Sequence, residues 1–129
     1  MSDGSSLDGH GTSMSQTAKP GVRVVLGTDG RACTPDLSIL AEMRTVAQTH
    51  PSLPRETIVR MGTVDAADAL GLASTCGAIA PAQAADLVAI ELPSGEPART
   101  SPDTETLSRL VLETELPVQG VWLGGQRIN

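Results

Sequence analysis

Apolar residues recur at helical spacing early in the chain. Between residues 35 and 48 they form one apolar stripe, which predicts an amphipathic helix. Pro35 suits the first turn of this helix because proline has no backbone N–H to leave unpaired there. Thr34 or Asp36 would then cap the amino end through its side-chain oxygen. The prediction is a helix that starts near Pro35.

Three shorter patterns predict further helices. One is expected at 54–61, after two prolines have ended the first helix. An Ala-rich helix is expected at 65–70, followed by Gly71 in a position that commonly ends helices. An amphipathic helix is expected at 104–115. The region 93–103 before it holds three prolines and is predicted to be a loop.

The apolar pattern also predicts strands. Residues 22–26 are a short apolar run rich in β-branched side chains, typical of a strand covered on both faces in a parallel sheet. Further strands are predicted at 86–92 and 118–123. Gly124 and Gly125 predict a hairpin turn after the last of these. Helices and strands together indicate an α/β fold.

Composition suggests elements that pack inside a larger structure. The chain has 129 residues, whereas a complete α/β barrel takes about 250. It contains no Phe, no Tyr and one Trp, although aromatic side chains usually supply much of the core of an independent domain. Residues 1–20 are rich in Ser, Gly and Asp and are predicted to be a disordered tail.

Charge and cysteine content narrow the class of protein. The formal net charge is −6 and the basic residues are scattered, so we expect no nucleic-acid partner. No apolar stretch approaches the roughly 20 residues of a membrane span, and no signal peptide is recognised. Cys33 and Cys76 are too few for a disulfide framework. We therefore expect a cytoplasmic protein with reduced thiols and no membrane partner.

Asp29 is the strongest candidate for chemistry. It lies between Thr28 and Gly30, just beyond the carboxyl end of the strand predicted at 22–26. Barrels and open α/β sheets build their active sites at that end of their strands. A carboxylate there can bind a metal ion or exchange a proton with a metal-bound water. The alternative is that Asp29 only stabilises a turn, since Asp followed by Gly is a common turn pair.

A series of short motifs follows the strand predicted at 22–26. It begins with Gly-Thr-Asp at 27–29 and continues at 36–44, 61–63, 69–72, 77–81, 85–88 and 121–127. In this order the motifs resemble the C-terminal end of the amidohydrolase superfamily, in the branch of chlorohydrolases and of cytosine, guanine and methylthioadenosine-type deaminases. Gly-Thr-Asp resembles the motif that ends the eighth barrel strand of that family. Gly62 stands where the family usually has Ala.

The resemblance implies a fold and a site. The fold would be the C-terminal fragment of a TIM-barrel metal-dependent hydrolase, with the last barrel strand and following helices at 21–75. Residues 76–129 would form C-terminal strands of a composite β-sandwich, with an inserted loop and helix at 93–115. Asp29 would be both the metal ligand and the catalytic proton shuttle, with zinc or iron as the family's metal.

The family's remaining ligands are not recognised in this chain. The family uses a His-x-His pair, two further histidines and usually a glutamate, whereas this sequence holds only His10 and His50, in other contexts. One aspartate cannot hold a catalytic metal that takes three or more protein ligands. The chain is therefore expected to bind no metal alone and to be inactive alone.

Three interpretations remain open. In the first, the chain is a piece of a hydrolase that breaks C–N or C–Cl bonds of nitrogen heterocycles with metal-activated water, and takes a small-molecule substrate only when complete. In the second, it is a non-enzymatic binding module that completes a partner chain carrying the missing barrel. In the third, it is an unrelated small α/β domain. A barrel strand without neighbours exposes unpaired backbone groups, which argues against independent activity.

Overall fold

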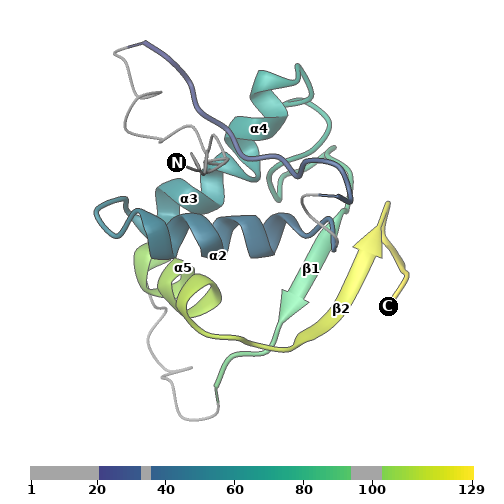
Figure 1. Ribbon diagram of the computed structural model, residues 1–129. Coiled ribbons are helices and arrows are strands. Elements are labelled where there is room, and N and C mark those ends of the chain that lie inside the picture. The colour runs from purple at the N-terminus through teal and green to yellow at the C-terminus, as the bar shows by residue number, and fades with distance from the viewer. Residues whose placement is uncertain (1–20, 33–35, 94–102) are drawn as a thin grey trace, which may run out of the picture.

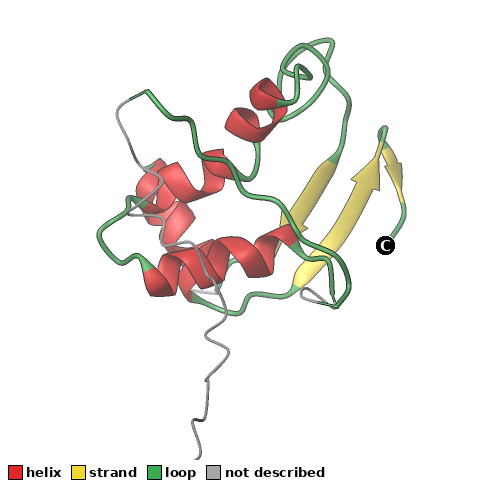
Figure 2. Cartoon of the chain, turned by 45° about the horizontal axis from the view of Figure 1, so that its top comes forward, coloured by secondary structure: helices red, strands yellow, loops and turns green. Residues whose placement is uncertain are grey.

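The computed structural model describes residues 21–32, 36–93 and 103–129, and within these ranges it contains helices and one small antiparallel sheet (Figures 1 and 2). The elements in chain order are α2 (Ile39–Thr49), α3 (Arg55–Met61), α4 (Val64–Ala69), β1 (Leu87–Ile90), α5 (Thr104–Glu113), β2 (Val118–Leu123) and β3 (Gln126–Arg127). All four predicted helices and the two later strands are confirmed. The strand at 118–123 has the predicted bounds, and the other elements have shifted ends. The predicted tail at 1–20 lies outside the described residues.

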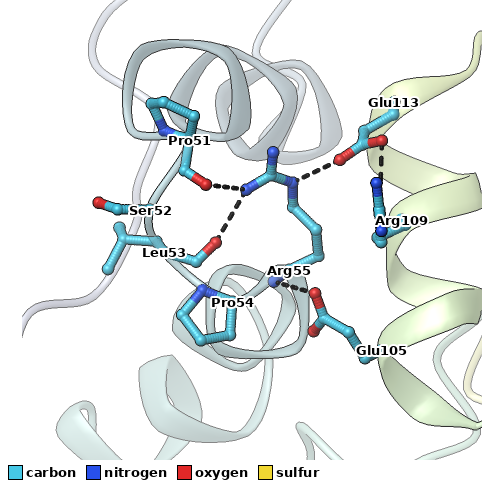
Figure 3. Close-up of a pocket in the computed structure, with 8 residues that line it drawn as sticks. All are labelled: Pro51, Ser52, Leu53, Pro54, Arg55, Glu105, Arg109 and Glu113. Atoms are coloured by element: carbon cyan, nitrogen blue, oxygen red, sulfur yellow. Dashed lines mark hydrogen bonds and ion pairs between the residues drawn. The ribbon is translucent and has the colours of Figure 1, made fainter.

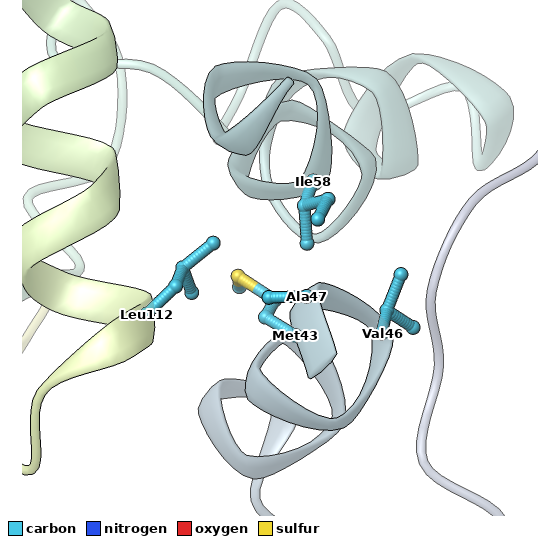
Figure 4. Packing of buried hydrophobic residues seen from close by; sticks show 5 residues of the cluster. All are labelled: Met43, Val46, Ala47, Ile58 and Leu112. Atoms are coloured by element: carbon cyan, nitrogen blue, oxygen red, sulfur yellow. The ribbon is translucent and has the colours of Figure 1, made fainter. Parts of the chain in front are cut away.

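The helices α2, α3 and α5 enclose the main core (Figure 4). Met43, Val46 and Ala47 face inward from α2, and they meet Ile58 of α3 and Leu112 of α5. Ile58 is fully buried and Leu112 is only 2% exposed. The apolar stripe predicted for the first helix is therefore the stripe that packs. The last helix joins this core although residues 62–103 separate it from α3 in the sequence.

The start of α2 differs from the prediction. The helix begins at Ile39, and Ser38 is its cap, with the Ser38 hydroxyl accepting a hydrogen bond from the Ala41 N–H at 3.2 Å. Leu37 has a positive φ of 49°, a left-handed conformation that a right-handed helix cannot include. Asp36 instead accepts a hydrogen bond from the Ser38 N–H in a local turn. The expected cap at Asp36 is thus wrong, and Thr34 and Pro35 lie outside the described residues.

The sheet has the strand order β1-β2-β3, with both pairs antiparallel. Leu87 pairs with Trp122, and the register shifts between Ala89 and Ile90. Gly124 and Gly125 connect β2 to β3 with φ values of 56° and 82°, which glycine adopts without steric strain. The predicted hairpin turn is confirmed. The sheet lies to one side of the three packed helices in both views (Figures 1 and 2).

The strand predicted at 22–26 is not formed. The segment is extended but pairs with no strand among the described residues, so it has no sheet to enter. Val22 is 50% exposed and Val25 is 36% exposed, so the segment is not covered on both faces. Its apolar run is typical of a buried strand, but a strand also needs a neighbour for its backbone N–H and C=O groups. That neighbour is absent from the part of the chain that the structure describes.

The observed architecture is a mixed α/β arrangement with a small sheet. The barrel and the composite β-sandwich implied by the family resemblance stay predictions. None of the described helices is long and apolar enough to cross a membrane.

Candidate functional site

Asp29 lies in an exposed loop directly after the extended segment 22–26. Its carboxylate Oδ1 accepts a hydrogen bond from the Gly30 N–H at 2.7 Å. This contact is the one expected if Asp29 stabilises a turn. It occupies one carboxylate oxygen and leaves Asp29 accessible to solvent, so the loop can still present the side chain to a ligand. The role predicted for Asp29 stays a prediction.

The described residues do not form a metal centre around Asp29. Within 21–32, 36–93 and 103–129, the structure has no group of three or more His, Cys, Asp or Glu side chains that could hold a metal ion. A catalytic zinc site needs about three protein ligands and an open position. The described part of this chain therefore does not fit a complete metal site, and Asp29 could contribute only one ligand to a site completed by other residues.

The histidines and cysteines of this chain are the other residue types that could bind a metal ion. His50 caps the carboxyl end of α2, where its backbone N–H donates to the Val46 carbonyl. Its ring Nδ1 lies 2.9 Å from the Thr49 hydroxyl. Cys76 is a half-buried free thiol. His10 and Cys33 lie outside the described residues. None of the described side chains in this group lies in a cluster of metal-binding residues.

A polar hollow forms where the amino end of α3 meets α5 (Figure 3). Its lining consists of Pro51, Ser52, Leu53, Pro54, Arg55, Glu105, Arg109 and Glu113. The Arg55 guanidinium lies between the loop and α5: it donates to the carbonyls of Pro51 and Leu53, and pairs with Glu113 at 2.8 Å. The Glu113 side chain is 38% exposed and is held by this ion pair. No spacing in the sequence indicates the pair, because 58 residues separate the partners.

Glu105 caps the amino end of α3 from a different helix. Its two carboxylate oxygens accept hydrogen bonds from the Arg55 N–H at 3.0 Å and the Glu56 N–H at 2.9 Å. These bonds favour the charged carboxylate and lower the pKa of Glu105, with the Glu56 N–H the larger cause. The charged side chains in this hollow form ion pairs and hydrogen bonds within the protein. These contacts join α5 to α3, so the hollow is not the candidate active site.

Comparison with known proteins identifies the family. Residues 8–128 match the model of the amidohydrolase family, which is nearly the whole chain. The chain belongs to the amidohydrolase family. The superfamily resemblance read from the ordered motifs is thereby confirmed. The matched range also includes 93–115, the range expected to hold an inserted loop and helix.

The curated relatives of this amidohydrolase chain are mostly deaminases. It is 30% identical over 117 residues to a 5-methylthioadenosine/S-adenosylhomocysteine deaminase of Teredinibacter turnerae, covering 84% of this chain and 26% of that protein. It is 44% identical over 79 residues to the deaminase of the same name from Pyrococcus furiosus, covering 56% and 18%. An S-triazine hydrolase of Gordonia rubripertincta is 27% identical over 100 residues, covering 72% and 20%. The chain thus spans about a quarter or less of these relatives.

A solved structure supports the same family. An adenosine deaminase from Xanthomonas campestris, with bound zinc, superposes with a TM-score of 0.63 at 28% identity. The match covers 80% of this amidohydrolase chain and 25% of that protein. The zinc in that structure is consistent with a metal in the family. The described residues of this chain hold no group of three or more side chains that could bind such a metal, whereas a catalytic zinc takes about three protein ligands.

Proposed function

We propose that this chain is the C-terminal part of a deaminase that hydrolyses a carbon–nitrogen bond of an adenosine-like heterocycle. The observation that carries the proposal is the family match over 8–128, together with relatives named as deaminases of methylthioadenosine, S-adenosylhomocysteine and deoxyadenosine. The S-triazine hydrolase among the relatives keeps other nitrogen heterocycles within the proposed substrate class.

Asp29 is the residue of this chain that takes part in the proposed site. It contributes one carboxylate to a metal site, zinc in the first instance, and acts as a proton shuttle. The support is its place in the Gly-Thr-Asp motif at 27–29 and its exposed position in a loop. The missing histidine ligands come from further polypeptide, either the rest of a longer chain or a partner chain. The 129 residues alone are inactive in this proposal.

Fragment complementation tests the proposal. The chain is mixed with the Teredinibacter turnerae deaminase from which the matching segment has been deleted, in the presence of zinc and 5-methylthioadenosine. We expect ammonia release from the mixture and none from either piece alone. The Asp29→Asn variant should remove the activity while the two pieces still co-elute. Asp65→Asn is the matched control, because it also neutralises an aspartate but lies on α4.

Two results would contradict the enzyme proposal. Ammonia release by the 129 residues alone would show that the chain needs no other polypeptide. A complex that co-elutes and retains zinc, yet releases no ammonia from any of the nucleosides in the relatives' names, would favour the non-enzymatic module that completes a partner. Unchanged turnover in Asp29→Asn would remove the role assigned to that residue.

A further inference from the structure

The extended segment that carries Asp29 is held at two points, although it belongs to no sheet. The segment runs beside the junction of α3 and α4 in both overall views (Figures 1 and 2). Its first attachment is at Leu26, whose N–H donates to the Met61 carbonyl at 2.9 Å. The half-buried Leu26 side chain also packs against the helical core. Met61 is the last residue of α3, so this attachment fixes the segment to the end of that helix.

The second attachment is an ion pair between Arg23 and Asp68 of α4. It joins residues that are 45 positions apart in the sequence. Both side chains are more than half exposed, so the pair is weak as a source of overall stability. Arg23 lies three residues before Leu26 on the same extended segment. The ion pair therefore attaches the segment at a second point.

The two attachments are made to two consecutive helices, which together form the α3–α4 unit. The helices α3 and α4 are separated only by Gly62 and Thr63. The Thr63 hydroxyl donates to the Val59 carbonyl at 2.8 Å, and the Thr63 N–H donates to the Arg60 carbonyl at 3.1 Å. One attachment alone would leave the segment free to pivot about Leu26. Two attachments to the same unit fix its direction as well as its position.

We propose that Arg23 and Asp68 are positioning residues for Asp29. Asp29 lies three residues beyond Leu26, about 10 Å of extended chain. If the extended segment rotated about Leu26, the part that carries Asp29 would turn through a similar angle, and the Asp29 carboxylate would move. The Arg23–Asp68 ion pair holds the segment on the amino-terminal side of Leu26 and so restricts this rotation. The Asp29 carboxylate therefore occupies a narrower range of positions. The catalytic part of this inference rests on the proposed function, because it needs Asp29 to act in a site.

Hydrogen exchange and amide shifts of the full 129-residue chain test the inference without metal or substrate. We expect Asp68→Asn to lower the protection of the Leu26 amide roughly three- to fivefold, as for loss of one exposed ion pair. The amide of Gly30, which donates to Asp29, should shift at the same time. The charge-swapped double variant Arg23→Asp with Asp68→Arg should restore both signals.

Asp65→Asn is the matched control. Asp65 is on the same helix and forms an ion pair with Arg60 of α3 at 2.6 Å. We expect it to leave Leu26 and Gly30 unchanged. In the complementation assay, Asp68→Asn should lower kcat with KM unchanged, because misplacing one reacting group affects the reaction more than binding.

Each other outcome overturns the inference. These are an unprotected Leu26 amide in the wild-type chain, equal effects of Asp65→Asn and Asp68→Asn, and no restoration by the swapped pair. The exchange experiment is independent of catalysis. Suppose that Asp68→Asn lowers the protection of the Leu26 amide selectively and the swapped pair restores it, but the complementation assay releases no ammonia. This combination would reject the proposed function and would still support the two attachments of the segment.

Discussion

Leu112 offers a sharp test of how this chain folds, because it belongs to a helix late in the sequence and is buried in a core built mainly from earlier helices. It is 2% exposed and lies among Met43, Ala47 and Ile58 (Figure 4). Leu112→Ala removes three carbon atoms from the contact between α5 and the other two helices. We expect a large loss in the free energy of unfolding.

The magnitude follows from burial and from the small size of the core. Truncation of a buried leucine to alanine costs about 2–5 kcal/mol, and more when the cavity cannot collapse. The neighbours of Leu112 come from two other helices, so a rearrangement of α5 alone cannot refill the space. We expect about 3 kcal/mol, which lowers the ratio of folded to unfolded chain roughly 150-fold.

Urea unfolding followed by the helical circular dichroism signal measures this loss. With a slope of about 1.5 kcal/mol per molar, the midpoint should fall by roughly 2 M. Leu123→Ala is the matched control, since it makes the same chemical change at a side chain that is 61% exposed. It should change stability by less than about 0.5 kcal/mol. A loss below about 1 kcal/mol for Leu112→Ala, or one equal to the control, would refute the packing of α5 on α2 and α3.

Three further predictions concern other parts of the molecule. Gly77→Ala should destabilise the chain by at least about 1–2 kcal/mol in urea unfolding, because Gly77 has a φ of +95° and an added Cβ would lie 2.6 Å from the Ala67 Cβ. The control Gly30→Ala places its Cβ in open space and should be nearly neutral. The pKa of Glu105 in the folded chain is below its ordinary value of 4.5. The stability that the Glu105 carboxylate contributes is therefore complete above pH 4.5 and is lost as the pH falls through the lower folded-state pKa. Glu105→Gln should show a smaller fall in the urea midpoint between about pH 7 and pH 3 than the wild type, and an unchanged fall would count against the capping of α3 by Glu105. In a two-dimensional amide NMR spectrum of the whole chain, added zinc should shift no peaks, and a saturable set of zinc-dependent shifts would show that the chain holds more ligands than Asp29.

The sequence predicted the helices well because their evidence is local. Apolar spacing located α2 and α5. Prolines, alanines and Gly71 located α3 and α4, and a glycine pair located the turn before β3. The start of α2 was misplaced because Pro35, Thr34 and Asp36 gave a plausible start. The left-handed conformation at Leu37, which prevents an earlier start, has no signal in the sequence.

The segment 22–26 shows the limit of such local evidence. Its β-branched residues favour extended backbone, and extended backbone is what the structure has. Whether an extended segment becomes a strand depends on a neighbour, and the neighbour is not encoded in the segment itself. The same limit applies to Asp29: its motif and loop position were legible, but the residues that would surround it in a working site are not among those described.

The sequence by itself determined the local elements, the family and the candidate carboxylate, because periodicity, turn residues and ordered motifs are properties of short stretches. Only the tertiary structure decided which distant residues meet. It placed Leu112 in the core of α2 and α3, Glu105 on the amino end of α3, and Asp68 beside Arg23. Such contacts depend on how the elements pack in space, and no spacing along a chain of 129 residues specifies that arrangement.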